Sequence, residues 1–354
     1  MGRFERKANE GKRRIHVGVD LHYLRWHVTI LENDIEHFCG SIAGQWLALR
    51  SLLDKYGAGK EIVVVYESGY FGYTLYDQVI AYGAECVVTP PSLIPREPGN
   101  RVKTDRRDSR KLAYYLMQGM LKAVHVPTVE ERYHRQVLRR RQQLISDRRR
   151  VQQRIKAELC ANGIRLTNPG TSWSSRFETE LHQLRFGDHF MEESFKRLLG
   201  EYENLKKDVK DQTALMRELA KTDYYKERVA ILTSTAGIGV LSAMQFLVEM
   251  QDVARFRRAD QISSYVGLTP SQYSSGEHVR MGQITRTGKG MVRSMLIESS
   301  WILIRKDGAM RLKYEAIKSR AGAKRAIVAI ARILLLRLRH MLIHKEMYVV
   351  GLAG

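Results

Sequence analysis

The chain has 354 residues, 44% of them hydrophobic, which excludes a disordered chain and is enough for two or three compact units. Its 59 Lys and Arg residues against 38 Asp and Glu residues give a formal net charge of +21. That charge favours a polyanionic partner, first of all nucleic acid, over a ribosome-associated or merely solubilising role.

Cysteine spacing and hydropathy indicate the cellular compartment in which the protein works. Cys39, Cys86 and Cys160 show no paired spacing of the kind that structural zinc or a disulfide framework needs. Residues 15–19 are already strand-like, so we expect no secretion signal. Residues 326–338 are apolar but contain two arginines and are shorter than the roughly 20 residues of a membrane span, which predicts a buried amphipathic helix. We expect a cytoplasmic protein, nucleoid-associated when active, with no membrane partner.

The first part, residues 14–126, alternates between strand and helix patterns. Short apolar runs at 15–19, 26–31 and 37–42 predict three adjacent strands. A helix over 45–56 then leads to the β-branched run 62–65, which is typical of a strand covered on both faces. A helix over 73–82 and a strand over 86–88 complete an α/β layer with a central sheet.

The middle part, residues 129–221, predicts long helices. Residues 132–156 hold ten Arg or Lys side chains around a thin apolar stripe, which makes one face cationic, with Arg139, Arg140 and Arg141 at its centre. Further along, a heptad seam is formed by Phe195, Leu198, Tyr202, Leu205, Val209, Gln212, Met216 and Leu219. The seam predicts a coiled-coil arm whose partner helix lies either in another copy or in the same chain.

The third part, from about residue 225, is helical at both ends with a Gly- and Ser-rich centre over 267–290. We therefore divide the chain into 1–128, 129–224 and 225–354. The predicted fold class is α/β plus all-α, with a mainly helical C-terminal domain.

Four carboxylates can converge in the first part. Asp20 and Glu67 each follow directly on a predicted strand, and strand ends in α/β sheets are where sites assemble. Asp105 and Asp108 are three residues apart, so on a helix they share one face. Singly, each is also typical of a turn or a helix N-terminus. Together they indicate a ribonuclease-H-like site for Mg²⁺ (or Mn²⁺), with Lys103, Arg106 and Arg107 near the DNA backbone.

A glycine turn precedes a predicted helix in the third part. Gly237 and Gly239, in Ala-Gly-Ile-Gly, are similar to the turn of helix-hairpin-helix DNA binders, whose backbone amides grip a phosphate. The alternative is a packing turn between helices.

A serine-rich segment offers a nucleophile. Ser275, beside Ser274 and before a glycine, has several cations within about twenty positions, and these can hold the charge of a phosphodiester under attack: Arg280, Arg286, Lys289 and Arg293. His278 is a candidate base. On the alternative view the serines only form turns in a flexible loop.

Taken together, these residues carry a family resemblance. The motifs Gly18-Val19-Asp20, Tyr66-Glu67-Ser68-Gly69 and Lys103-Thr104-Asp105-Arg106-Arg107-Asp108, followed by Ala236 to Gly239, Gly267 to Pro270 and Ser274-Ser275-Gly276, resemble the insertion sequence 110 family of DEDD transposases. That family includes a pilin-gene DNA invertase. The resemblance spans nearly the whole chain.

The resemblance implies more than the residues do by themselves. It implies a Holliday-resolvase-like domain holding Mg²⁺ through Asp20, Glu67, Asp105 and Asp108, and a transposase domain in which Ser275 forms a phosphoserine with DNA. It also implies donor and target DNA as partners, a structured noncoding guide RNA, and composite sites in a homo-oligomer, dimer or tetramer. The basic helix is then an RNA or DNA binding face.

Three rival functions remain open. A metal-dependent Holliday-junction-type nuclease would cut DNA without a covalent intermediate. A nonenzymatic protein that binds structured RNA would not need the carboxylates. A site-specific DNA invertase would use the same chemistry as a transposase.

Overall fold

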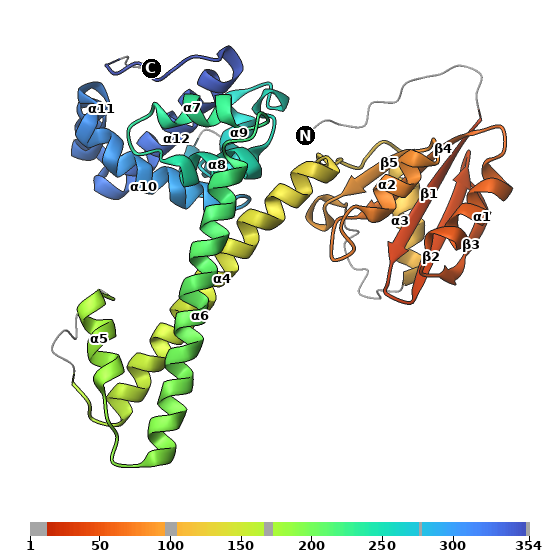
Figure 1. The fold of residues 1–354 in the computed structure, drawn as a ribbon. Helices are drawn as coiled ribbons and strands as arrows, with labels where there is room; N and C mark the ends of the chain where they lie inside the picture. Colours follow the sequence, from red (N-terminus) through yellow and green to blue (C-terminus); the bar gives the residue numbers. More distant parts are fainter. Residues whose placement is uncertain (1–12, 96–104, 166–172, 276–277, 352–354) are drawn as a thin grey trace. The chain divides into compact units, whose positions relative to one another are not determined.

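The computed structural model describes residues 13–95, 105–165, 173–275 and 278–351, and for 105–106, 273–275 and 278–281 it describes the backbone alone. The chain forms two compact units, Met1–Val126 and Pro127–Gly354. The α/β first unit and the mostly helical second unit confirm the coarse fold class (Figure 1).

The first unit is built on one five-stranded sheet. Its strands, in the spatial order β3-β2-β1-β4-β5, are β1 (Arg14–Leu21), β2 (Arg25–Glu32), β3 (Ile35–Ala43), β4 (Glu61–Glu67) and β5 (Glu85–Thr89). β1, β2 and β3 form an antiparallel meander, while β4 is parallel to both β1 and β5. Helices α1 (Trp46–Gly57) and α2 (Thr74–Ala81) make the two crossovers. All these predicted strands and helices are confirmed.

Both faces of this sheet are covered, as the β-branched run in β4 predicts. On one face Val64 and Tyr66 join a core with side chains of α1 and α2. On the other face Val63 and Val65 pack with Leu112 of α3 (Asp105–Met117). These four side chains of β4 are fully buried, and burial contributes about 2 kcal/mol for each. The short 3₁₀ helix η1 (Pro91–Leu93) follows β5.

In the second unit, helices α4 (Val129–Ala161), α5 (Ser175–Gln183) and α6 (His189–Leu219) form the arm, in which α4 and α6 lie side by side (Figure 1). A capping box of Thr128 and Glu131 starts α4. The seam of α6 faces α4 of the same chain, since Gln212 Nε2 donates to the Val137 carbonyl oxygen at 3.1 Å. The partner helix is therefore the one within the chain, and the two helices run antiparallel.

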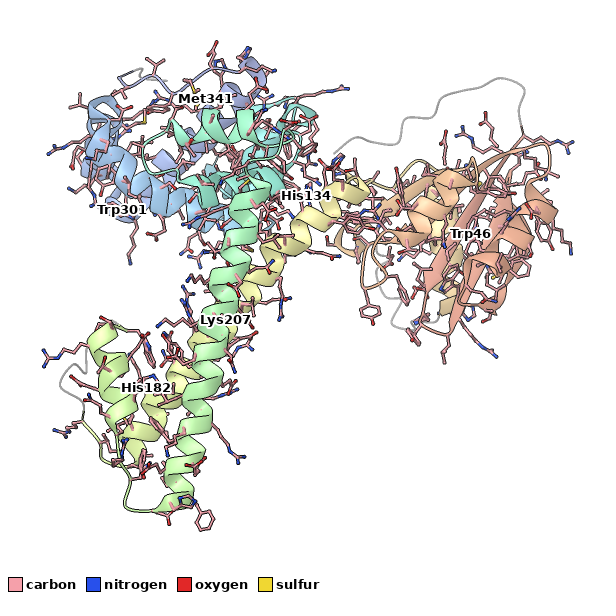
Figure 2. All side chains as sticks on the ribbon, in the orientation of Figure 1. Trp46, His134, His182, Lys207, Trp301 and Met341 are labelled. Carbon is pink, nitrogen blue, oxygen red and sulfur yellow. The ribbon has the colours of Figure 1, made fainter. Side chains whose placement is uncertain are left out.

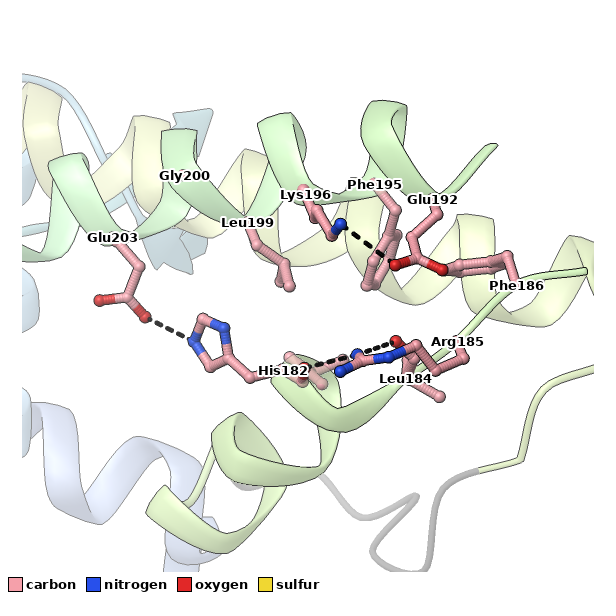
Figure 3. A pocket seen from close by; sticks show the side chains of 11 residues that line it. His182, Leu184, Arg185, Phe186, Glu192, Phe195, Lys196, Leu199, Gly200 and Glu203 are labelled. Atoms are coloured by element: carbon pink, nitrogen blue, oxygen red, sulfur yellow. Dashed lines mark hydrogen bonds and ion pairs between the residues drawn. The ribbon is translucent and has the colours of Figure 1, made fainter. Parts of the chain in front are cut away.

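The arm also has a core of its own at its far end. Val151, Ile155 and Leu159 of α4 are buried there with side chains of α5 and α6. Figure 2 labels His134 near the base of the arm and His182 towards this end. Figure 3 shows a cleft between α5 and α6, with His182 3.3 Å from Glu203 and Lys196 3.1 Å from Glu192.

The rest of the second unit is a helical bundle with one β-hairpin. Its elements are α7 (Lys226–Thr233), α8 (Val240–Met250), η2 (Val253–Arg255), α9 (Ala259–Val266), β6 (Pro270–Ser275), β7 (His278–Ile284), α10 (Gly290–Lys306), α11 (Gly308–Ala321) and α12 (Ala323–His344). Helix α12 is the predicted buried amphipathic helix, with Ile330, Leu334 and Leu338 in the core. Among the described residues, no helix is long and apolar enough to cross a membrane.

Candidate active site

Asp20 and Glu67 lie at the same edge of the sheet. β1 and β4 are adjacent and parallel, and Val19 is opposite Tyr66 in their register, so the next residue of each strand is a candidate carboxylate. Glu67 is exposed, and the Asp20 side chain is 21% exposed. His22 Nε2 lies 3.3 Å from Asp20 Oδ2. The structure thus brings these two acidic residues together, as predicted for strand ends.

Helix α3 lies directly on β1 at Ser109 and Ala113 because residue 18 is glycine. A Cβ at Gly18 would be 2.1 Å from the Ser109 carbonyl oxygen and 2.5 Å from the Ala113 nitrogen, both of which are backbone atoms. Only glycine allows this approach. Asp108, which is partly buried, precedes Ser109 and is thereby held beside the edge where β1 ends.

A buried hydroxyl pair fixes the same helix to β2. Thr29 and Ser109 are both fully buried, and their hydroxyl oxygens lie 2.9 Å apart. Thr29 also lies 3.3 Å from the Cys39 sulfur of β3. The start of α3 is therefore positioned by polar as well as apolar contacts.

The predicted quartet is described only in part. Asp105 is the first residue of α3, but its side chain lies outside the description. Within the described residues, no three His, Cys, Asp or Glu side chains are arranged to hold a metal ion. The donor set fits a hard divalent cation in kind, since all four candidates offer carboxylate oxygens.

The cations predicted around the quartet differ in their surroundings. Lys103 and the side chain of Arg106 lie outside the described residues, and Arg107 is exposed. Arg110 donates two hydrogen bonds to Glu36, at 2.6 and 2.9 Å. Arg110 is thus paired with Glu36 of β3, and both Arg107 and Arg110 are exposed to solvent.

Ser275 is the last residue of β6, in a hairpin that the sequence pattern left as a possible loop. In the register of the two strands, Ser275 is opposite His278 and Ser274 is opposite Val279. Arg280 is opposite Tyr273. The side chains of these six residues lie outside the description.

Arg293 closes the base of this hairpin. Its guanidinium donates to the carbonyl oxygen of Val266 at 2.7 Å, before the hairpin, and to those of Arg286 at 3.1 Å and Thr287 at 3.2 Å, after it. Gly288 (φ +75°) packs here as well, because a Cβ would lie 2.1 Å from the Tyr265 carbonyl oxygen. Arg293, which we predicted to bind nucleic acid, is thus a structural clamp in this conformation. Arg286 is exposed, with φ +54°.

Glu249 is a buried carboxylate that sequence reasoning missed. Its side chain is 4% exposed, and Lys289 Nζ donates to it at 2.5 Å, while Arg135 and Arg139 of α4 lie 3.9 and 3.6 Å away. Burial would raise the pKa of Glu249, but the hydrogen bond and charges of these cations outweigh it and lower the pKa. A lone acid in an apolar run, from Phe246 to Met250, was the available signal.

The remaining predicted contacts fall into two kinds. Gly237 (φ +91°) packs against α10, since a Cβ would lie 2.6 Å from the Ser299 carbonyl oxygen, whereas Gly239 is exposed at the start of α8.

Arg140 is exposed on α4, but Arg141 Nε donates to Thr213 Oγ1 of α6 at 2.8 Å. Burial, together with the charges of nearby arginines, lowers the pKa of Arg141. Arg140 and Gly239 are thus the solvent-facing members of these pairs.

Comparisons with known proteins cover both candidate regions. A family model for DEDD transposases of IS110, described as "Transposase", matches residues 17–161. A model described as "Transposase IS116/IS110/IS902 family" matches residues 229–315, which include the hairpin and Ser275.

Individual relatives agree with these matches. The chain is 30% identical over 293 residues to "Putative transposase y4qE" of Sinorhizobium fredii, covering 82% of this chain and 72% of the relative. It is 28% identical to the transposase for insertion sequence element IS1533 of Leptospira borgpetersenii (68% and 71% covered). It is 27% identical to the transposase for IS1111A of Coxiella burnetii (69% and 67% covered).

These similarities define the class of protein first: the chain is an enzyme, a DNA transposase. More narrowly, it belongs to the IS116/IS110/IS902 family of insertion-sequence transposases. The DEDD match also implies a general dependence on divalent metal.

Proposed function

We propose that this transposase cuts and rejoins DNA with two groups of residues, a carboxylate quartet in the first unit and the nucleophile Ser275 in the second. The observation that carries the proposal is the parallel register of β1 and β4, which puts Asp20 beside Glu67, together with the packing of α3 over Gly18. The order of strands is compatible with a ribonuclease-H-like domain of the Holliday-resolvase type.

Asp20, Glu67, Asp105 and Asp108 would hold Mg²⁺ or Mn²⁺. Oxygen-only donors suit such hard cations, and all four residues belong to the ends of two neighbouring strands and to the first turn of one helix. When bound, the metal supplies stabilisation of negative charge on the phosphate that reacts. Arg107, exposed on the same turn, attracts the DNA backbone.

Ser275 attacks the scissile phosphodiester. A bond forms between its Oγ and phosphorus, the bond from phosphorus to the leaving deoxyribose oxygen breaks, and that oxygen takes up a proton. The serine proton passes to a base, for which His278, opposite in the hairpin register, is the candidate. Arg280 and Arg286 are near in sequence and offset the charge of the phosphate. Rejoining is the reverse reaction with a new deoxyribose hydroxyl.

The partners are donor and target DNA and a structured noncoding guide RNA. The support is the net charge of +21 and the cationic helix α4, where Arg139 and Arg140 are exposed. We propose a homo-oligomer, dimer or tetramer, in which the carboxylates of one copy and the serine of another form a composite site.

A covalent adduct tests the chemistry. Purified protein is incubated with its element-end DNA, the adjoining noncoding RNA and Mg²⁺, and denaturing gels compare wild type with Ser275→Ala, Ser274→Ala and Asp20→Ala. We expect an adduct in wild type and Ser274→Ala and none in Ser275→Ala. Cleavage that survives Ser275→Ala but not Asp20→Ala, with no adduct in any lane, would establish a metal-dependent nuclease instead. Omitting the RNA tests guidance, because binding to unrelated DNA would then persist while cleavage at the element end is lost.

A further inference from the structure

Two exposed tyrosines flank the edge where Asp20 and Glu67 lie. Tyr23 is 78% exposed and Tyr70 is 89% exposed. Each follows a candidate carboxylate by three residues, and each is in the loop that leaves the end of β1 or β4. Because these strands are parallel neighbours, the two loops emerge at the same edge of the sheet.

The backbone around Tyr70 is fixed although its ring is exposed. Ser68 N donates to the Thr89 carbonyl oxygen at 2.8 Å, and Gly72 N donates to that of Gly69 at 3.2 Å. The buried Tyr66 donates its hydroxyl to the Gly72 carbonyl oxygen at 3.0 Å. The ring of Phe71 meets that of Tyr70 edge-on, with centroids 5.4 Å apart. The Tyr70 ring is therefore presented on an ordered loop, which reduces the entropy lost when a partner binds it.

A flat aromatic ring in solvent suits one component of nucleic acid in particular. Phosphates are attracted by cations, but bases offer π faces, and stacking on an aromatic side chain needs no sequence match. A ring can stack on a base only where that base has partly left its neighbours, which also exposes the adjoining phosphate to attack.

We propose that Tyr70 and Tyr23 stack on nucleobases beside the scissile phosphate and hold the DNA in an unstacked form at the carboxylate edge. This inference rests on one part of the proposed function, namely that DNA is cut at the carboxylate edge. It assigns to the two tyrosines the positioning of substrate, a role separate from metal binding and from the covalent step.

Photocrosslinking tests the contact directly. Full-length protein is bound in Ca²⁺, to separate binding from cleavage, to element-end DNA with 5-iodouracil placed in turn at thymines near the cleavage point. Iodouracil crosslinks to aromatic rings stacked on it. Tryptic digestion separates the two sites, because Tyr23 falls in peptide 15–25 and Tyr70 in peptide 61–96. We expect crosslinks in both peptides, mapped to these residues by fragmentation.

Variants give a second readout. We expect Tyr70→Leu to weaken DNA affinity about tenfold and to lose the crosslink in 61–96, while Tyr70→Phe keeps both. The matched control is Tyr114→Leu, an exposed tyrosine in the second half of α3, with unchanged affinity and crosslinks. Crosslinks confined to other peptides, with wild-type affinity in Tyr70→Leu, would overturn the inference. So would a changed oligomer mass in Tyr70→Leu without DNA, coupled with no crosslink, since the ring would then contact protein.

The two proposals fail differently. Crosslinks at Tyr70 without any Ser275 adduct would reject the serine mechanism and keep the stacking role. An adduct without the crosslinks would do the reverse.

Discussion

The hydroxyl oxygens of Thr29 and Ser109 lie 2.9 Å apart, with both residues fully buried between strand β2 and helix α3. Ser109 follows Asp108 directly, so this hydrogen bond acts on the turn that carries a candidate metal ligand. The pair is 80 residues apart in sequence and links the helix to a strand that contributes no carboxylate to the quartet.

The first prediction concerns this pair. Ser109→Ala should reduce the free energy of unfolding by about 1 kcal/mol, since the Thr29 hydroxyl loses one of its two partners in the core and keeps the Cys39 sulfur. The double variant Thr29→Val with Ser109→Ala should lose less than the sum of the single variants, because no buried hydroxyl of the pair then remains. Denaturant unfolding of all four proteins measures the coupling. Strict additivity would show that the two hydroxyls do not interact.

Gly18→Ala should displace α3 from β1. The added Cβ would meet backbone atoms at 2.1 and 2.5 Å, which cannot move as a side chain can. We expect a loss of about 3 kcal/mol and faster hydrogen exchange in peptides of α3. Gly200→Ala is the control, because a Cβ there meets nothing within 4 Å on helix α6 and should stabilise by up to about 1 kcal/mol. Equal effects from the two changes would contradict the packing argument.

The variant Arg293→Lys distinguishes the effect of the positive charge at position 293 from the effect of its hydrogen bonds at the hairpin base. Lysine keeps the positive charge but cannot donate to the three carbonyl groups that Arg293 joins at the hairpin base. We expect DNA affinity within twofold of wild type and a rate of adduct formation about 100-fold lower, because Ser275 is then misplaced. Filter binding and single-turnover gels measure the two quantities. A proportional loss of affinity would mean that Arg293 contacts the DNA phosphate instead.

The ion pairs of Glu249 on α8, with Lys289 and with the arginines of α4, should be sensitive to acid. Its pKa in the folded protein is lowered from 4.5, so its stabilisation is present above pH 4.5 and is lost as the pH falls through the folded value. Glu249→Gln should cost about 3 kcal/mol at pH 7, because Lys289 loses its buried partner. The difference between wild type and variant should shrink below pH 4.5, measured as unfolding free energy across pH. A constant difference would exclude the ion pairs as its cause.

Arg140 and Arg141 are adjacent on α4 but should behave differently. Arg140→Gln should lower the slope of log affinity against log salt by about 0.9, the effect of one phosphate contact, and leave thermal stability unchanged. Arg141→Gln should instead lower the melting temperature, since Arg141 bonds to Thr213 of α6. Salt titrations and thermal melts of both variants provide the comparison. If the slopes change equally, exposure does not decide which arginine binds nucleic acid.

Much of the first unit was predictable because its signals are local. Val63, Val64 and Val65 are β-branched residues in a row, and a strand buried on both faces needs no long-range information. The positions of Asp20 and Glu67 followed from the ends of such strands. Their proximity did not follow from the strands alone, since it depends on β4 pairing with β1 although β2, β3 and α1 lie between them in the chain.

The second unit was predicted less completely. Residues 270–284 lack apolar alternation, so the hairpin under Ser275 could not be distinguished from a loop. The contacts of each cation could not be predicted from the sequence either. Lys289 pairs with Glu249, 40 residues away, and Arg293 donates to backbone carbonyl oxygens. The heptad seam was clear, but periodicity in one chain does not tell which helix faces it.

The separate core at the far end of the arm has a consequence for how this protein can vary. Val151, Ile155 and Phe195 belong to that core, whereas Leu138 and Met216 belong to the main core of the second unit. Adding or removing seven residues in each of α4 and α6 between these clusters would keep both seams in phase and shift the tip by about 10 Å. The length of the arm can therefore change in steps of one heptad while the residues around Ser275 stay unchanged.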